Sequence, residues 1–373
     1  MSIRRNGARV WVRELTAEDH EQVSQLTQRH GIRTESLERW RHLWFSNPAY
    51  GKARTNWPLG WVLEDADGRI VGHLGNIPLE YVWRGCSWLA ATSRTWVVDQ
   101  PFRGFAPLLL DCHFGQRNVD IFLHPTVNAD ASAAYATFDA RRVPVGQWDR
   151  ALFWITGYRG LIEAWLKMRR VPFSTALSYG GAAALFLKDK VKEKPSPKHL
   201  DIEFEECHAF DGRFESFWQE LKARDEKLLL AVRSREALQW HFKYAFTDKR
   251  VSVIAAIRRD QIYAYAIFLR YDNRRLGLRR IRLVDFQALE GADAVLIASL
   301  SWIREKCRRD AIHAFEVVGV RPVGNDTIEA LAPHSRPLPA WLYYYHVPDP
   351  GLAKELADPL VWNPCAYDGD ASL

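Results

Sequence analysis

The sequence of residues 95–110, TWVVDQPFRGFAPLLL, passes from a β-branched and aromatic run into a glycine-containing turn and then a leucine-rich segment. This order predicts a strand that ends near Asp99, a turn around Gly104 and a helix that starts close to Ala106. Amide groups at the start of a helix have no partner within it and lie at the positive end of its dipole. We therefore expect a seat for a phosphate group here, with Arg103 as a fixed positive charge beside it.

A second strand and helix follow. Residues 119–123 predict a strand, and Asn128 is a suitable N-cap for the helix after it. Ala131 and Tyr135 lie on successive turns of that helix, at positions that are neighbours on its surface. The stretch 92–135 is therefore expected to form a strand, a helix, a second strand and a second helix.

The same order of parts occurs twice in the chain. In each half, a capped helix with a tryptophan at fixed spacing precedes a β-hairpin, and the hairpin precedes a strand that ends in Val-Asp. The matched features are Thr34 and Ser234, Trp40 and Trp240, the hairpins 61–74 and 251–269, and Asp99 and Asp285. We interpret this order as a diverged duplication of one α/β unit, the alternative being two unrelated α/β domains.

A charged segment separates the two halves. Residues 188–198 hold five lysines, two acids and two prolines, a composition that buries little surface and is typical of a linker. The expected organisation is an N-terminal cofactor-binding lobe at 1–187, a linker at 188–199 and a C-terminal lobe at 200–373.

The overall composition is that of a folded protein. The chain has 373 residues, 47% of them hydrophobic, and a net charge of +6 that is spread along the sequence. Its apolar runs are far shorter than the roughly 20 residues that span a membrane, and from residues 1–5 we expect no secretory signal. The five cysteines form no CxxC pair, so we expect no metal site and no disulfide framework. The expected location is the cytoplasm.

Together these segments resemble the GCN5-related N-acetyltransferase (GNAT) superfamily, over about residues 8–150. The opening strand and helix of that family are matched at 12–19, where Thr16 and Asp19 have capping-box spacing. The cofactor loop, R-x-x-G-x-G/A, aligns with 103–108, and the late helix, N-x-x-A-x-x-x-Y, with Asn128 to Tyr135. The second half resembles a degenerate copy. The resemblance implies an α/β (α+β) fold with two tandem GNAT-like lobes, each a mixed, mostly antiparallel central sheet flanked by helices.

The resemblance also implies a cofactor site. In the GNAT fold two parallel strands, here about 92–99 and 119–124, splay apart and admit the pantetheine arm of acyl-CoA. The implied co-substrate is acetyl-CoA or another acyl-CoA, and no metal is implied. The implied cofactor-binding residues are Val97, Val98, Arg103, Gly104, Phe105, Ala106 and Asn128.

The family mechanism needs an acid for the departing thiolate and a base for the attacking amine. The motif places Tyr135 as the acid. Residues 90–98 contain no carboxylate, so His124 is the first candidate base, with Glu80 and His73 as rivals and a water relay as a further option. Acids and aromatic residues at 362–370 either line a cleft between the lobes or form a solvated terminus.

The expected function is transfer of an acyl group, acetyl first of all, from CoA to a primary amine of a small molecule or amino sugar. Pro107 and Leu108 depart from the loop pattern, which favours the alternative of a non-catalytic acyl-CoA-binding or scaffold protein. A further alternative is a Fem-like aminoacyl-tRNA-dependent transferase, which would bring arginines such as Arg279 and Arg280 to a phosphate backbone. Apart from that alternative, no nucleic acid partner is expected. The sequence does not determine the oligomeric state.

Overall fold

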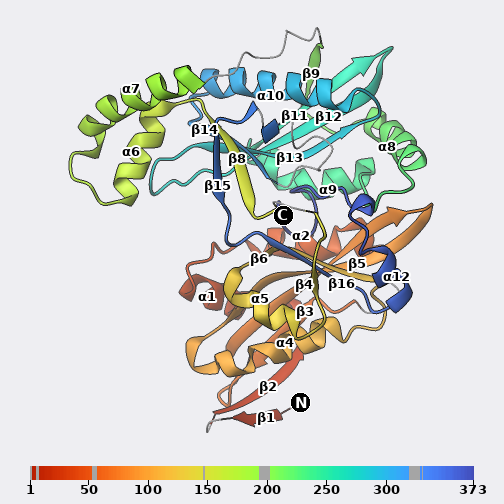
Figure 1. Ribbon diagram of the computed structural model, residues 1–373. Helices are drawn as coiled ribbons and strands as arrows, with labels where there is room; N and C mark the ends of the chain where they lie inside the picture. Colours follow the sequence, from red (N-terminus) through yellow and green to blue (C-terminus); the bar gives the residue numbers. More distant parts are fainter. Residues whose placement is uncertain are drawn as a thin grey trace.

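The computed structural model describes residues 2–5, 8–52, 57–145, 148–192, 202–318, 328–329 and 331–373. The chain forms two lobes, each built on one β-sheet with helices around it (Figure 1). The N-terminal strand lies at the outer end of the first lobe, and the C-terminal end of the chain lies between the two lobes.

The first sheet has the order β1-β2-β3-β4-β5-β6-β16-β7, and β10 pairs with β4. Its strands are β1 (Ser2–Arg5), β2 (Ala8–Glu14), β3 (Gly60–Glu64), β4 (Ile70–Trp83), β5 (Cys86–Val98), β6 (Ile121–Val127), β7 (Arg141–Arg142), β10 (Leu230–Ala231) and β16 (Leu342–His346). The helical segments of this part of the chain are η1 (Ala17–Asp19), α1 (His20–Arg29), α2 (Leu37–Phe45), α3 (Pro48–Lys52), η2 (Gln100–Phe105), α4 (Ala106–Phe114) and α5 (Ala129–Ala136).

The second sheet has the order β15-β8-β14-β13-β12-β11-β9. Its strands are β8 (Arg150–Ile155), β9 (Phe204–Cys207), β11 (Val251–Arg258), β12 (Gln261–Arg270), β13 (Arg280–Ala288), β14 (Ala314–Val318) and β15 (His334–Pro337). The remaining helical segments are α6 (Tyr158–Met168), α7 (Ser174–Lys192), α8 (Gly212–Arg224), α9 (Arg235–Thr247), α10 (Ala292–Arg309), α12 (Pro350–Glu355) and η3 (Pro359–Val361).

The two sheets repeat one strand pattern, as the matched order of parts in the sequence predicts. In the first sheet β3, β4 and β5 pair antiparallel in turn, and β6 then pairs parallel to β5. In the second, β11, β12 and β13 pair antiparallel and β14 pairs parallel to β13. Each sheet is therefore mixed and mostly antiparallel, which confirms the predicted fold class.

The sheets exchange a strand, which the sequence analysis did not predict. β8, from the first half of the chain, pairs antiparallel with β14 in the second sheet. β16, from the second half, pairs antiparallel with β6 in the first sheet. The strands therefore do not divide at the predicted linker, 188–199. Helix α7 continues to Lys192, and residues 193–199 lie outside the described part of the chain.

The lobes share a hydrophobic core. Tyr81 and Trp83 from the first sheet belong to the same buried cluster as Phe214 and Trp218 from α8. Helices α2 and α9 also meet directly, because His42 Nε2 lies 2.9 Å from the carbonyl oxygen of Trp240, and Trp240 Nε1 donates to the carbonyl oxygen of His42 over 3.0 Å. Burial of this kind is typical of one cooperative unit rather than two loosely linked domains.

The predicted helix caps are partly confirmed. Thr16 and Asp19 form the expected capping box, and Ser234 caps α9. Thr34 was predicted to cap the helix that contains Trp40, and this prediction is wrong. The helix begins later, and its cap is Ser36, whose Oγ accepts from the Arg39 N–H over 3.3 Å.

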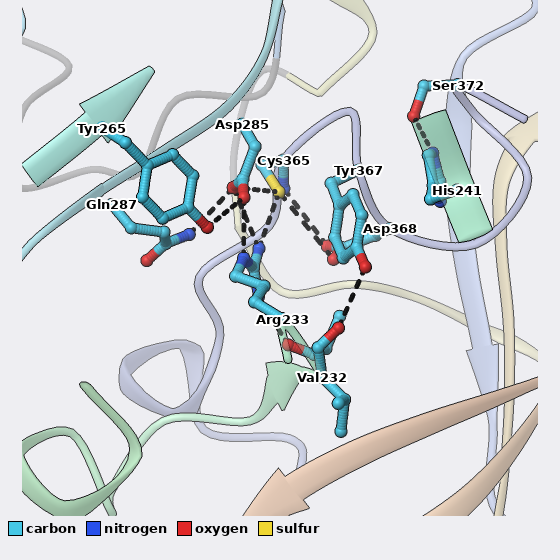
Figure 2. A network of polar contacts seen from close by, with 11 residues as sticks. Val232, Arg233, His241, Tyr265, Asp285, Gln287, Cys365, Tyr367, Asp368 and Ser372 are labelled. Atoms are coloured by element: carbon cyan, nitrogen blue, oxygen red, sulfur yellow. Dashed lines mark hydrogen bonds and ion pairs between the residues drawn. The ribbon is translucent and has the colours of Figure 1, made fainter. Parts of the chain in front are cut away.

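A buried polar network ties the lobes together (Figure 2). Arg233, just after the β10 strand that pairs with the first sheet, donates from Nε to Asp285 on β13 over 2.8 Å. The side chain of Arg233 is 1% exposed and that of Asp285 is 0% exposed. Tyr265 Oη donates to the same carboxylate over 2.8 Å, and Gln287 Nε2 donates over 2.9 Å. Burial alone would raise the pKa of Asp285, but Arg233 and these donors hold it below the usual value.

Removal of one partner of this pair is expected to destabilise the whole chain. Arg233→Met leaves the Asp285 carboxylate buried without its counter-charge, and such a loss costs about 3–5 kcal/mol. Urea unfolding monitored by circular dichroism measures this change. Arg308→Ala, which removes an exposed pair with Glu305, is the control and should change the unfolding free energy by less than about 1 kcal/mol. Equal effects of the two substitutions would contradict a special role for the buried pair.

Candidate functional site

The candidate site is the opening between β5 and β6. These strands pair in parallel at only two positions, Ala90 with Ile121 and Ala91 with Phe122. Every residue of both strands is described, and beyond Ala91 no further ladder pair joins them. Each strand stays attached on its outer side, β5 to β4 and β6 to β16. The inner edge of β5 from Thr92 onward therefore has no strand partner, at the place predicted for the splay.

A bulge shapes β5 along this opening. The register between β4 and β5 shifts between His73 and Gly75, and Thr95 has the left-handed φ of 57°. His73 Nδ1 donates to the Thr95 carbonyl oxygen over 3.0 Å. Burial lowers the pKa of His73 to about 4, so its imidazole is neutral near pH 7. His73, an alternative candidate for the general base, therefore stabilises the bulge through its hydrogen bond to Thr95.

Three side chains meet where the pairing of β5 and β6 ends. Ser93 Oγ lies 2.9 Å from Tyr135 Oη and 2.9 Å from His124 Nδ1. Tyr135 comes from α5, His124 from β6 and Ser93 from β5. The structure thus brings together two of the three predicted catalytic residues. Ser93 was missed, and its only signal in the sequence is a hydroxyl in the interior of a strand expected to be apolar.

Burial decides the protonation of this trio. It lowers the pKa of His124 well below the usual value, and the neighbouring His113 and His346 lower it further. His124 Nδ1 also accepts from the Ser93 N–H over 3.3 Å, so the ring proton is on Nε2. His124 is therefore a weak base that orients Ser93. Burial raises the pKa of Tyr135, and the hydrogen bond between Tyr135 and Ser93 opposes that rise.

The C-terminal segment 365–373 lies in this opening rather than in solvent. Gly369, with a left-handed φ of 57°, packs so closely that a Cβ there would lie 2.4 Å from Pro125 Cδ. Thr126 Oγ1 donates to Asp370 over 2.9 Å, and Arg94 donates to the carbonyl oxygen of Leu373 over 3.1 Å. The alternative of a solvated terminus is wrong, because Tyr367 and Asp368 are buried, and Tyr367 and Gly369 line the pocket between the lobes.

Two acidic residues, Asp368 and Asp370, lie in this segment. Burial raises the pKa of Asp370, although Arg94 and Thr126 act in the opposite direction, and the charge of Asp370 in turn raises the pKa of Tyr135. Burial raises the pKa of Asp368 to about 7. Asp368 Oδ2 accepts from the Cys365 N–H over 3.2 Å and lies beside the network of Figure 2.

The predicted cofactor loop is more helical than expected. β5 ends at Val98, and η2 then leads directly into α4. Arg103 and Gly104 are exposed, Phe105 is buried, and the Ala106 N–H donates to the carbonyl oxygen of Arg103. The amide of Ala106 is therefore already engaged within the turn. Val97 and Val98 lie on β5 opposite His73 and Gly72.

Asp99 and Asn128 follow the C-terminal ends of β5 and β6, one on each side of the opening. Burial alone would raise the pKa of Asp99, but Arg29 at 2.7 Å and His30 at 3.1 Å lower it, so a cation offsets the carboxylate next to the expected phosphate seat. Asn128 caps α5 as predicted, because its Oδ1 accepts from the Ala131 N–H over 2.8 Å. Its contact with a cofactor stays a prediction.

Glu80 does not join this site. It lies on β4 opposite Leu89, whereas the β4 residue opposite Ser93 is Asn76. Four residues separate Glu80 from Asn76, which is roughly 14 Å along a strand. The carboxylate of Glu80 pairs with Lys52 over 2.7 Å and lines a separate pocket of about 50 Å³ between the lobes.

The second lobe presents a different surface at the corresponding place. β13 and β14 pair from Arg280 to Leu283, and Asp285 follows inside β13, opposite Ile267. The predicted equivalence with Asp99 is therefore wrong, because Asp99 lies beyond the end of its strand. In the second lobe the guanidinium of Arg233 forms an ion pair with the carboxylate of Asp285 (Figure 2). Over the described residues, no group of three or more His, Cys, Asp or Glu side chains could hold a metal ion.

Comparisons with known proteins find similarity in structure. No protein-family profile and no curated sequence matches the chain. A GCN5-related N-acetyltransferase from Anabaena variabilis ATCC 29413 has a TM-score of 0.52 at 12% identity, over 91% of this chain and 72% of its own. A GCN5-related N-acetyltransferase from Kribbella flavida has a TM-score of 0.54 at 11% identity, over 91% of this chain and 71% of its own. A Saccharomyces cerevisiae N-myristoyltransferase, solved with bound myristoyl-CoA, has a TM-score of 0.53 at 11% identity, over 92% and 84%.

These likenesses extend over both sheets, because each covers at least 91% of this chain. The protein therefore has the GNAT fold. More particularly, it has the tandem form of that fold, with two GNAT-like lobes in one chain, as the sequence resemblance implies. Within the described residues, no helix combines the length and apolar character needed to cross a bilayer.

The buried Asp368 gives a prediction for pH dependence. Its folded pKa of about 7 lies above the ordinary value of 3.8, so the protonated acid favours the folded state. That contribution is fully present below about pH 4 and is lost as the pH rises through about 7. Relative to the wild type, Asp368→Asn should therefore gain stability between pH 4 and 8, on the order of a few kcal/mol.

Urea unfolding at a series of pH values measures this difference. The control is Asp260→Asn in an exposed turn between β11 and β12, where the difference from wild type should not vary with pH. If the Asp368→Asn difference is as flat as the control, the carboxylate does not titrate near pH 7.

Proposed function

We propose that this protein is an acyl-CoA-dependent N-acyltransferase, which transfers an acyl group to a primary amine of a small molecule or amino sugar. The observation that carries the proposal is the contact of Tyr135 with Ser93 and His124 at the point where β5 and β6 diverge. The tandem GNAT fold supports it, as does the myristoyl-CoA bound to the structurally similar yeast N-myristoyltransferase.

The residues present fit an acyl-CoA. The β5 edge from Thr92 to Val98 has no ladder partner toward β6, so its backbone groups suit the amides of a pantetheine arm. The exposed guanidinium of Arg103 stands at the start of the helical segment that follows β5 and suits a pyrophosphate. Acyl-CoA, when bound, supplies the activated carbonyl that an amine attacks. The proposed co-substrate is acetyl-CoA or another acyl-CoA, and acetyl-CoA is the first to test.

Tyr135 is the proposed acid. Its hydroxyl gives a proton to the departing sulfur, and Ser93, 2.9 Å away, then donates a hydrogen bond to the phenolate. Ser93 has a single hydroxyl proton, which points either to His124 or to Tyr135. Before Tyr135 gives up its proton, the Ser93 hydroxyl therefore donates to His124. Afterwards it donates to the Tyr135 phenolate. In this scheme His124 is a positioning residue.

Asp370 is the proposed base. It is the carboxylate held beside the opening by Thr126, and burial raises its pKa, which makes it a better proton acceptor than an ordinary aspartate. It removes the proton that the amine loses as the new bond to the acyl carbon forms. This assignment replaces Glu80, which lies elsewhere on β4. We expect the chain to act in the cytoplasm, where its five unpaired cysteines would stay reduced.

The first test concerns the phosphate seat. Arg103→Ala removes one charge-assisted contact and should weaken CoA binding by about 1–3 kcal/mol, measured by isothermal titration calorimetry. Arg258→Ala, an exposed arginine on β11 of the second lobe, is the matched control and should bind CoA like the wild type. Unchanged affinity in the Arg103 variant would show that the loop is misassigned. If the wild type binds no CoA at all, the scaffold alternative is favoured.

The second test concerns the acid and the base. Tyr135→Phe and Asp370→Asn should each lower kcat, by about 10²–10⁴-fold for a lost general acid or base, and should keep CoA affinity. The assay is thiol release from acetyl-CoA and longer acyl-CoA with a library of primary amines and amino sugars. Tyr263→Phe on β12 is the control for the loss of a tyrosine hydroxyl. Full activity of Tyr135→Phe would remove its proposed role, and tight CoA binding without turnover by the wild type would favour a sensor.

A further inference from the structure

Helices α6 and α7 form a hairpin that projects from the side of the second lobe (Figure 1). The two helices pack chiefly against each other. Polar contacts fix the base of the hairpin, because Asp189 near the end of α7 accepts from Tyr158 Oη over 3.0 Å and lies 2.8 Å from His334 Nε2. The hairpin is therefore an ordered structure with one face toward the protein and one face toward solvent.

The solvent face is unusually apolar. Eleven large hydrophobic side chains are exposed in the described part of the chain, and seven of them lie at 165–187 on this hairpin. Phe173, at the tip, is 83% exposed and Leu187 is 64% exposed. On α7 the buried positions Ser178 and Asp189 lie on the inner face, whereas Leu177 and Leu187 point outward. Seven exposed large apolar side chains gathered on one hairpin of a folded protein indicate an interaction surface.

Most charges that border this surface are positive, and the acid on α6, Glu163, is paired with Lys167 over 2.8 Å. Residues 171–187 contain no Asp, Glu, Lys or Arg. Exposed cations border them at both ends, Arg169 and Arg170 before the segment and Lys188 and Lys190 after it. The one acid in the last turns of α7, Asp189, faces inward and is already bound by Tyr158. An apolar face bordered by cations complements a layer of hydrocarbon beneath anionic head groups.

The length of the helix indicates how it would lie. α7 has 19 residues, which is about 28 Å, but only 174–187 are free of charge, about 21 Å and less than the roughly 30 Å of a hydrocarbon core. The hairpin therefore suits a position in the plane of a membrane surface. A second copy of the chain is a poorer partner, because a symmetric pairing would bring the same four cations of each copy together.

We propose that the α6–α7 hairpin docks this protein on a bilayer surface that contains anionic phospholipid. The outward side chains of α6 and α7 enter the boundary of the acyl chains, and Arg169, Arg170, Lys188 and Lys190 lie at the level of the phosphates. This inference does not depend on the proposed acyl transfer, since it uses no residue of the β5–β6 opening. It assigns the chain a place of action at a membrane surface.

The experiment is co-sedimentation of the full chain with vesicles of phosphatidylglycerol and phosphatidylcholine, 1:1, compared with phosphatidylcholine alone. The wild type should partition at least tenfold more strongly onto the anionic vesicles. Leu177→Ser with Leu187→Ser should lower that partition at least tenfold, as should Lys188→Glu with Lys190→Glu. The matched control is Leu360→Ser, which removes an exposed leucine at η3 and should bind vesicles like the wild type.

Thermal unfolding and CoA titration of each variant show whether the fold is kept, and all substituted side chains are exposed. Absence of the wild type from the pellet with anionic vesicles would overturn the proposal. So would equal binding by the folded serine variant. A wild type that is dimeric by light scattering, with a monomeric serine variant, would show that a second copy covers this face instead.

Discussion

The early end of pairing between β5 and β6 is the constraint on which the site depends. Two parallel strands that stayed paired along their length would leave no backbone group free between them. Here the ladder stops after Ala91, while β4 and β16 hold the outer edges. The gap is stable because β4 and β16 bond the backbone groups on the outer edges of β5 and β6. Of these two partners, β16 comes from the other half of the chain. The exchange of β8 and β16 thus supports this opening, since β16 pairs with β6, and makes the two lobes a single unit.

The two lobes share a strand pattern but differ at this place. In the first, the gap holds neutral, hydrogen-bonded side chains that meet at Ser93, together with the carboxylate of Asp370. In the second, Asp285 lies inside β13 and is bound by Arg233 with almost no exposure. A buried carboxylate that already has a guanidinium partner stabilises structure and is not free to act on a ligand. The two lobes therefore differ in this place: the first has the candidate site, and the second has a buried ion pair.

Part of the site could be predicted because local signals placed it. Asn128, Ala131 and Tyr135 follow helix spacing, and capping by Asn128 needs only the residues next to it. His124 lies on the strand that precedes this helix, so its contact with Tyr135 could be predicted from the sequence. Ser93 was not, because a serine in a strand has no periodic signature. Asp370 could not be found either, since its 244-residue separation from Thr126 is closed only by the folded chain.

The sequence by itself determined the elements and their order, because hydrophobic period, turn residues and caps act over a few residues. It determined the strand pattern of each lobe and, through it, the class of fold. The tertiary structure decided which half of the chain completes each sheet, where the segment 365–373 lies, and which carboxylates are buried. Those outcomes depend on contacts between residues far apart in the chain, and the burial that sets the pKa values of Asp368 and His124 exists only after those contacts have formed.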